Sequence, residues 1–368
     1  MGTPYYYERE PREATIAVMN AGRAVVVSRL AEVGIRDEGY TAFLGRHEEA
    51  TPFHLPSWTE VIAATYKFTP SVLCLRDDGG EITAASPGVH VGGRLRGRRW
   101  VSLPFTDACA PLADDAAAAE AFAAALDLHR HESGLKGIEI RGEVAGGAGK
   151  RHGVGYRHVI PLTTDEREMF RRLRERSRRA VKRARREGLV VRREPDLRSA
   201  RSNFWRLHCA TRRKLGVPVQ PRVFFDAIWR LMIERDCGHV LSAYLDSRPV
   251  ASVVFLERGA TIVYKFSASE PDLTRLHGPS AVLWEGIRAA GEKGQARMDL
   301  GRTEFGHEGL RYFKLGWGSE ETTLAYTYLG TDGPAESRGT DSLIGQIIQR
   351  SPTIVARTIG RVAYRWTA

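Results

Sequence analysis

The sequence predicts an α/β or α+β chain made of two similar lobes, each with a mixed central sheet flanked by helices. Segments with helical apolar periodicity alternate with short β-rich runs along the 368 residues. A pattern of strand, tight turn and strand begins at Ser71 and recurs 168 residues later at His239. The chain is also long for one core, so we predict two copies of one unit. Because hairpins are common, coincidence is the alternative explanation of this echo.

Each copy is predicted to contain a helix, a hairpin, a strand, a helix and a strand. In the first copy these elements span 57–68, 71–89, 100–105, 114–134 and 136–142. In the second copy they span 223–236, 239–257, 260–269, 278–294 and 296–301. A glycine-rich connection and a strand at 156–162 join the copies, and one amphipathic helix over 166–187 opens the second.

These elements place the two lobes at residues 22–163 and 164–330, with a cleft at their interface. An N-terminal extension over 1–21 precedes the lobes. Residues 331–368 are predicted to form a loop and a basic C-terminal helix.

The positive charge of the chain is concentrated in one segment. The net charge is +11, and residues 166–187 hold eleven Arg or Lys side chains but only four Glu. The rest of the chain is therefore only mildly basic. A clustered positive field attracts phosphates and other polyanions, so this segment is expected to contact such a partner.

Other functional classes find no support in the sequence. No apolar run approaches the roughly 20 residues of a membrane helix, and the polar N-terminus does not resemble a secretory signal. The four cysteines are widely spaced and form no metal pattern, which favours reduced thiols in a cytoplasm and no metal site. No phosphate loop, nucleophile elbow or zinc-protease motif is present, so we expect no covalent enzyme intermediate.

One partial motif points to acyl transfer. The segment "RLHGPS", Arg275–Ser280, follows a predicted strand and precedes a predicted helix. R-x-x-G-x-G/A in this position lets acyl-CoA-dependent acetyltransferases hold a pyrophosphate with backbone N–H groups. Here Ser280 replaces the last glycine and Pro279 removes one N–H donor, so the motif supports the fold better than it supports acyl-CoA.

The two-copy pattern, the basic stretch "RSRRAVKRARREG" and the late stretch "DLGRTEFGHEGLRYFKLGWG" together resemble the Fem-like aminoacyltransferases, in particular a FemAB-related branch. These proteins are double-lobed members of the GNAT acetyltransferase superfamily. The resemblance covers roughly residues 40–330, and "FHLPSW", "SLPFTD" and "GLRYFKLGWG" are its most specific pieces. It implies two tandem GNAT-like lobes and transfer of an amino acid from aminoacyl-tRNA to an amine. The substrate does not follow from the fold.

The sequence departs from the peptidoglycan-bridge enzymes of this family at two points. In those enzymes a lysine that helps to bind a nucleotide-linked precursor commonly follows the early tryptophan by four positions; counted from Trp58, that position is Ile62. The helical arm that some members insert is also missing. The first departure puts the cell-wall precursor of that family in doubt as a substrate.

Two residues are the candidate catalytic groups by this resemblance. Lys314, in "YFKLGW", matches a family lysine that faces the reacting carbonyl, and a strand is expected to deliver it to the site. Such a cation would stabilise the tetrahedral oxyanion. Asp107, which closes "SLPFTD", matches a family aspartate that could accept or orient the amine. The alternatives are a solvated strand lysine for Lys314 and a helix N-cap for Asp107.

Further residues are candidates for substrate binding. Arg302 sits at a predicted strand end beside Gly301 and could clamp a phosphate or carboxylate, or could simply pair with Glu304 or Asp299. Aromatic and basic side chains could line the channel or the rim of the site, although several are as readily explained as core. The full set of substrate-binding candidates is Arg302, Glu304, Trp58, Tyr264, Lys265, Tyr312 and Trp317.

The basic helix has three interpretations. It could bind the phosphates of tRNA, lie near anionic lipid together with the basic C-terminal helix, or be a solvated face. The predicted phosphate-binding residues are Arg178, Arg179, Lys182 and Arg186.

The leading hypothesis is a cytoplasmic aminoacyltransferase that uses aminoacyl-tRNA as a co-substrate, holds no permanent cofactor and acylates an amine of a small, peptide or envelope-related acceptor. Acyl-CoA is the alternative donor, and peripheral contact with an anionic membrane is an additional expectation. The rival class is a non-catalytic GNAT-like binding module of envelope or exopolysaccharide assembly. The sequence does not identify the acyl group, the acceptor or the oligomeric state.

Overall fold

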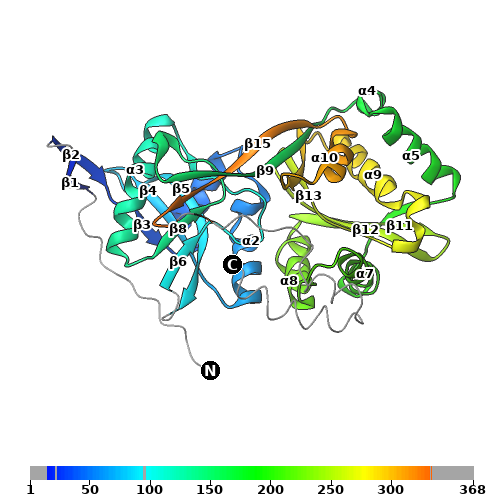
Figure 1. Ribbon diagram of the computed structural model, residues 1–368, viewed down its shortest axis with the longest axis horizontal. Helices are drawn as coiled ribbons and strands as arrows, with labels where there is room; N and C mark the ends of the chain where they lie inside the picture. Colours follow the sequence, from blue (N-terminus) through cyan, green and yellow to red (C-terminus); the bar gives the residue numbers. More distant parts are fainter. Residues whose placement is uncertain (1–14, 21–22, 94–96, 332, 334–368) are drawn as a thin grey trace.

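The computed structural model describes residues 15–20, 23–93, 97–331 and 333 (Figure 1). The predicted C-terminal helix and most of the predicted N-terminal extension lie outside these residues. A short antiparallel hairpin, β1 (Thr15–Asn20) and β2 (Arg23–Ser28), forms a sheet of its own before the main body.

One mixed sheet runs through both halves of the chain. In order across the sheet, its strands are β10 (Val190–Arg193), β11 (Gly238–Leu245), β12 (Arg248–Arg258), β13 (Thr261–Ser269), β14 (Arg297–Thr303), β9 (Lys150–Pro161), β15 (Glu320–Leu329), β8 (Gly137–Ile140), β6 (Gly97–Val101), β5 (Ile82–Gly93), β4 (Thr69–Arg76) and β3 (Ala31–Val33). A short strand, β7 (Leu112–Ala113), pairs with β5. The mixed α/β class predicted from the sequence is confirmed.

The strand order is the same on both sides of the central antiparallel pair of β9 and β15. On one side β14 runs parallel to β13, and β12, β11 and β10 follow in antiparallel order. On the other side β8 runs parallel to β6, and β5, β4 and β3 follow in the same way. This equivalent strand order on the two sides of the sheet is what two copies of one α/β unit would produce.

The two predicted hairpins occupy equivalent places in this order, as β4–β5 and β11–β12. Asp78 lies in the turn 77–81, whereas Asp246 lies in the shorter turn 246–247 and has a φ of 55°. The hairpins therefore match in position while their turns differ in length.

The two central strands are exchanged between the halves of the sequence. β9 lies before the lobe boundary predicted at residues 163 and 164, yet it pairs with β14 of the second half. β15 is the last described strand, yet it pairs with β8 of the first half. Each side of the sheet therefore takes its innermost strand from the other half of the chain.

Helices cover the sheet, and two of them join its halves. The α-helices of the described residues are α1 (Glu38–Arg46), α2 (Pro56–Tyr66), α3 (Ala116–Glu132), α4 (Glu166–Arg172), α5 (Glu175–Arg186), α6 (Leu197–Ala200), α7 (Arg206–Lys214), α8 (Arg222–Leu231), α9 (Gly278–Glu292) and α10 (Glu308–Leu315). Trp58 of α2 and Phe224 of α8 lie edge to face, with ring centroids 6.0 Å apart. Their core cluster also contains Val254 and Val263, so one apolar core spans both halves. Figure 1 shows α2 and α8 close together where the halves meet.

The basic segment 166–187 is not the single helix that the sequence predicts. It forms α4 and α5, which are separated at Leu173, where ψ is 141°. Arg178 of α5 donates hydrogen bonds to the carbonyls of Arg171, at 3.0 Å, and Leu173, at 2.6 Å. This guanidinium therefore satisfies carbonyl groups at the end of α4, which allows the helix to stop without glycine or proline.

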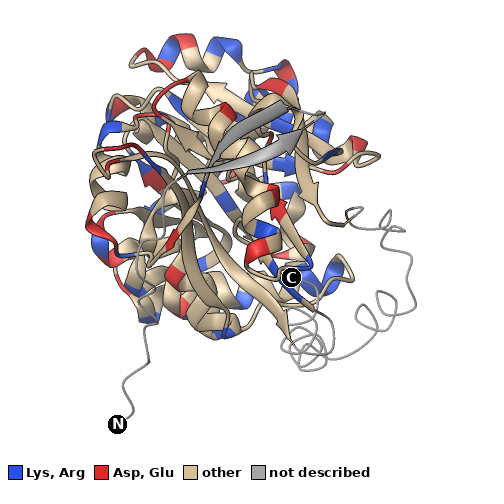
Figure 2. Cartoon of the chain, turned by 90° about the vertical axis from the view of Figure 1, so that its left-hand side faces the viewer, with Lys and Arg blue, Asp and Glu red and all other residues tan. Residues whose placement is uncertain are grey.

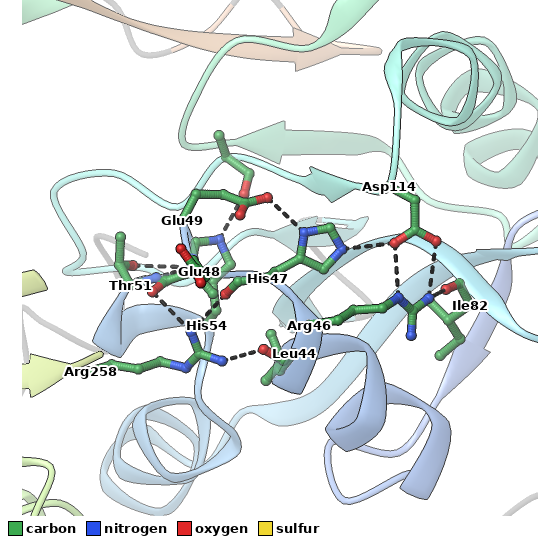
Figure 3. A network of polar contacts seen from close by, with 12 residues as sticks. Leu44, Arg46, His47, Glu48, Glu49, Thr51, His54, Ile82, Asp114 and Arg258 are labelled. Atoms are coloured by element: carbon green, nitrogen blue, oxygen red, sulfur yellow. Dashed lines mark hydrogen bonds and ion pairs between the residues drawn. The ribbon is translucent and has the colours of Figure 1, made fainter. Parts of the chain in front are cut away.

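An arginine of the second half closes the end of a first-half helix (Figure 3). Arg258, the last residue of β12, donates to the carbonyls of His47, at 3.0 Å, and Ala50, at 3.1 Å, and also to the carbonyl of Leu44. These groups lie at and just beyond the C-terminus of α1, where a cation is electrostatically favoured. The contact links residues more than 200 positions apart in the sequence.

The described residues contain no helix with the length and apolar character needed to cross a bilayer. Viewed from the end formed by the first half, Lys and Arg are interspersed with Asp and Glu (Figure 2). This mixture agrees with the concentration of net positive charge in residues 166–187.

Candidate active site

A bulge in β14 forms the centre of the candidate site. The register between β14 and β9 shifts between Asp299 and Arg302, and Gly301 has a φ of 72°. The Asp299 side chain accepts a hydrogen bond of 2.7 Å from the Gly301 N–H, which holds this conformation. A Cβ at position 301 would lie 3.0 Å from Asp107 Oδ2. A first-half carboxylate therefore lies against the backbone of the second-half bulge.

The loop that carries Asp107 follows β6 and has an unusual backbone. Leu103 and Phe105 both have a φ of 63°, a conformation that side chains other than glycine rarely adopt. Such backbone strain persists only where the surroundings impose it, and it clusters at functional sites. The loop is therefore a structural indication of function around Asp107.

Three side chains hold this loop in place. Trp58 Nε1 donates to Thr106 Oγ1 at 2.8 Å, and Arg141 donates to the Thr106 carbonyl at 2.9 Å. The Tyr326 hydroxyl, from the exchanged strand β15, donates to the Asp107 carbonyl at 2.6 Å. Trp58 is a fully buried core residue, as its alternative interpretation proposed, and its indole N–H has a positioning contact.

Lys265 joins the two halves at this loop. Its ammonium lies 2.8 Å from Asp107 Oδ2 and donates to the Phe105 carbonyl at 3.1 Å. The register shift between β12 and β13 leaves Lys265 without a strand partner between Tyr264 and Phe266. The Lys265 side chain is 4% exposed and that of Asp107 is 30% exposed. This ion pair occupies the interface where the sequence predicts a cleft, and Asp107 is its solvent-facing member.

Lys314, on α10, contacts the same bulge in β14. It lies on α10, not on a strand as predicted, and it is 5% exposed rather than solvated. Its ammonium donates to the carbonyls of Gly301 and Arg302, both at 2.9 Å. An ammonium has three N–H donors, so these bonds leave one donor for a ligand.

Burial lowers the pKa of Lys314 from its ordinary value of 10.5 to about 8. The negative charges of Asp107 and Asp299 act in the other direction, and the positive charges of Lys265 and Arg302 lower it further. Lys314 is therefore charged at neutral pH but gives up its proton more readily than an ordinary lysine.

For Asp107, neighbouring charged groups together have a larger effect on the pKa than burial has. Burial raises its pKa, but the charge and hydrogen bond of Lys265 outweigh burial, and Lys314 adds to their effect, so that the pKa of this carboxyl lies below its usual range. Asp107 is therefore ionised at neutral pH. A carboxylate of this kind can orient and charge-stabilise an amine, whereas it is a weak general base.

The remaining polar candidates form ion pairs around the bulge. Arg302 pairs with Glu304 at 2.8 Å, which is one of the alternatives weighed for it. Asp299 instead pairs with Arg157 of β9 at 2.8 Å. Arg302 and Glu304 are the more exposed pair and remain accessible to a ligand.

The aromatic candidates separate into core and surface residues. Trp317 is buried beside Phe313, with ring centroids 5.9 Å apart. Burial raises the pKa of Tyr264 to about 12, and its ring packs edge to face on Phe255. Tyr312 is 54% exposed on α10.

The phosphate-binding candidates lie on α5, but they are not equivalent. Arg178 is used within the protein, as described above, and Arg179 pairs with Glu175. Lys182 and Arg186 are exposed, and neither forms an ion pair within the described part of the chain. The apolar stripe of α5, including Val181 and Ala184, packs in the core cluster that contains α9.

Sequence reasoning missed Arg141, Arg157 and Tyr326. Each acts through a partner far away in the sequence, at separations of 35, 142 and 219 residues. No local motif marks them. Within the described ranges, no group of three or more His, Cys, Asp or Glu side chains could hold a metal ion.

Comparisons with known proteins relate part of the sequence to a family model and the fold to solved structures. The family model described as an acetyltransferase (GNAT) domain matches residues 171–321, which include α5, the bulge and Lys314. No curated protein matches the sequence.

Solved structures share the fold at low sequence identity. FemX is 15% identical, with a TM-score of 0.65 over 82% of this chain and 98% of that chain. L-PGS from Bacillus licheniformis is 13% identical, with a TM-score of 0.51 over 87% and 99%. A C-terminal domain from Agrobacterium fabrum, named for lysylphosphatidylglycerol synthetase, is 12% identical, with a TM-score of 0.54 over 79% and 90%. The second half of the chain thus matches an acetyltransferase (GNAT) domain model, and the chain shares its fold with FemX.

Proposed function

We propose that this protein transfers an aminoacyl group from aminoacyl-tRNA to the amine of an acceptor by direct attack. The observation that carries the proposal is the convergence of Lys314, the Gly301 bulge and the Asp107–Lys265 pair from both halves of the chain. A cation with one free donor and an oriented carboxylate are the groups that aminolysis of an ester requires.

In this reaction the acceptor nitrogen attacks the ester carbonyl carbon, and the carbonyl electron pair moves to oxygen. The free donor of Lys314 stabilises that oxyanion. When the intermediate collapses, the bond to the ribose oxygen breaks and that oxygen takes the proton that the amine loses. Asp107 orients the incoming amine from its exposed edge. The products are an amide and free tRNA, and no covalent enzyme intermediate forms.

The start of α9 favours tRNA over acyl-CoA as the donor. Pro279 has no N–H, and the N–H groups of Ser280 and Ala281 already donate to the His277 carbonyl, at 2.9 and 3.1 Å. Gly278 packs tightly, because a Cβ there would lie 2.8 Å from Ala251 Cβ. Few backbone donors remain at this helix start for a pyrophosphate, whereas the exposed cations of α5 suit the phosphates of RNA.

The two donors can be separated by one experiment. The protein is incubated with a pool of labelled aminoacyl-tRNAs and an amine pool, and in parallel with a pool of labelled acyl-CoAs. Wild type is expected to consume aminoacyl-tRNA, and Lys314→Met is expected to lose this activity. Consumption of acyl-CoA alone would contradict the tRNA proposal and leave the acyltransferase fold with the other donor.

Affinity for tRNA gives a second test. Phosphate contacts make the logarithm of the binding constant fall linearly with the logarithm of the salt concentration. Gln substitutions at Arg179, Lys182 and Arg186 are expected to flatten this slope, with each lost contact lowering it by about 0.7 to 0.9. Arg178→Gln should change the slope less, because Arg178 already binds two carbonyl groups of its own chain. A slope that is unchanged in the triple variant would rule out α5 as the tRNA surface.

A further inference from the structure

Tyr312 is a large exposed aromatic side chain on the same helix as Lys314. It is 54% exposed, although most large apolar and aromatic side chains of the described residues are buried. Tyr312 and Lys314 are two positions apart on α10, so they point to opposite sides of the helix. Lys314 faces the bulge, and Tyr312 faces outward about one helix diameter, roughly 10 Å, away.

One face of the Tyr312 ring is covered by an arginine. The guanidinium carbon of Arg176 lies 3.3 Å from the centre of the ring. Because this face is covered while the residue remains 54% exposed, the opposite face and the ring edge must provide the exposure. Tyr312 thus presents one open aromatic face to solvent.

The guanidinium of Arg176 contacts the Tyr312 ring and is not paired with a carboxylate of the described residues. It forms no ion pair within the described ranges, and its Nη2 atom is buried without a hydrogen-bond partner there. The charge under the ring is therefore not neutralised by a carboxylate. Arg176 also lies in the first turn of α5, which is about 18 Å long and carries the exposed cations Lys182, Arg185 and Arg186.

We propose that Tyr312 is a stacking platform for a base in the unpaired 3′ end of the donor RNA. This inference rests on the proposed use of aminoacyl-tRNA. Phosphates of the RNA would lie along α5, and a base near the end of the strand would stack on the open face of Tyr312. The terminal ester would then pass around α10 to Lys314. Aromatic rings serve single strands of any sequence in this way, because every base has a flat face.

The test uses uncharged tRNA and the same tRNA without its unpaired 3′ nucleotides, with binding measured by fluorescence anisotropy. One stacked base typically contributes 1–3 kcal/mol, which corresponds to roughly 5- to 150-fold in affinity. Wild type is expected to bind the shortened tRNA at least 5-fold more weakly than the intact one. Tyr312→Leu should lose this factor for intact tRNA and bind the shortened tRNA like wild type. Tyr312→Phe should keep it, because it keeps the ring.

Leu310→Ala is the matched control, since Leu310 is 41% exposed on the same helix and has no ring. It should bind both tRNAs like wild type. The proposal is overturned if Tyr312→Leu binds intact tRNA as tightly as wild type does, or if it loses the same factor for both tRNAs. Competition by coenzyme A that depends on Tyr312, without any effect of the 3′ nucleotides, would also overturn it and assign the ring to an acyl-CoA adenine.

The transfer assay separates this inference from the proposed function. If aminoacyl-tRNA is consumed and Tyr312→Leu has wild-type KM for it, the platform is wrong and the function stands. If affinity depends on the 3′ nucleotides and on Tyr312 while no aminoacyl group is transferred, the platform stands and the proposed reaction is wrong.

Discussion

The two halves of the molecule share one strand order but begin their equivalent helices differently. In the first half, α3 is capped by Asp115, whose carboxylate accepts a hydrogen bond of 2.8 Å from the Ala118 N–H. In the second half, α9 has no side-chain cap, and His277 before it has a φ of 54°. A carboxylate at the start of α3 repels any phosphate, so the first half cannot use this helix for an anionic donor.

The halves also differ in what they contribute to the site. The second half supplies Lys314, Lys265 and the glycine bulge, whereas the first half supplies Asp107 on a strained loop. This difference indicates that the two halves contribute to one site and do not form two. In the proposed reaction, one half carries the cations for the acyl donor and the other carries the acid that complements them.

The largest effect is expected from Lys314. Lys314→Met keeps much of the side-chain length and removes the charge, so turnover with the natural donor should fall on the order of 100- to 1,000-fold, while donor affinity changes little. Lys314→Arg should restore little of the rate, because a planar guanidinium does not replace a compact ammonium. Lys293→Met, at an exposed lysine of the same half, is the control and should keep wild-type turnover. Turnover of Lys314→Met within a few-fold of wild type would end the oxyanion assignment.

Asp107 tests the contribution of the first half. Asp107→Asn leaves the buried ammonium of Lys265 without a counter-charge, so the free energy of unfolding should fall by about 2 kcal/mol, less than for a fully buried pair because Asp107 is 30% exposed. Turnover should fall by about 10- to 100-fold, because the acceptor amine loses the carboxylate that orients it.

The double variant Asp107→Asn with Lys265→Met separates the two roles of Asp107. It should recover most of the stability, measured by denaturant unfolding, because the unpaired charge is gone. Its activity should stay low. Recovery of activity as well would mean that Asp107 only neutralises Lys265, and the first half would then contribute no chemistry.

The pH profile sharpens the assignment of the oxyanion cation. The pKa of Lys314 is lowered to about 8, so the ammonium is present below that pH and is lost above it. With the acceptor amine saturating, kcat should therefore fall above about pH 8, approaching ten-fold per pH unit. Lys314→Arg should lack this falling limb, because an arginine stays charged. A wild-type kcat that stays level up to pH 10 would show that the charge of Lys314 is not needed.

The last prediction concerns the stability that the link between the halves provides. Arg258→Met leaves the carbonyl groups at the end of α1 without their donor, so the free energy of unfolding should fall by about 1–3 kcal/mol in denaturant. Arg248→Met removes a surface arginine that pairs with Glu270, and its stability should change by less than about 0.5 kcal/mol. Equal stability of the two variants would show that Arg258 does not fasten α1.

The elements of this fold were predictable because apolar periodicity is local. Long segments such as α9 and β13 match their predicted ranges closely, since each carries its own pattern. The eight residues of α10 were misassigned to a strand because so short a run, rich in aromatics and flanked by glycines, shows no clear period. The break at Leu173 was also missed, because Arg178 replaces the usual sequence signals for a helix end.

Individual residues of the candidate site could be predicted from the sequence, but their contacts with one another could not. The resemblance indicated Lys314 and Asp107, but their relation depends on tertiary contacts: Asp107 and Lys265 are 158 residues apart in the chain. Lys314 lies on α10, which brings its ammonium to the carbonyl groups of Gly301 and Arg302 in β14. Nothing in the local sequence marks such contacts.

The exchange of β9 and β15 has a consequence for synthesis on the ribosome. The sheet of the first half lacks its innermost strand until residues 320–329 have emerged, because β15 supplies the neighbour of β8. Domains usually fold in turn from the N-terminus as they are made. Here the first half must wait, with this edge of β8 unpaired, until β15 has been translated. The first part of the chain to be made is thus completed by a strand that is made much later.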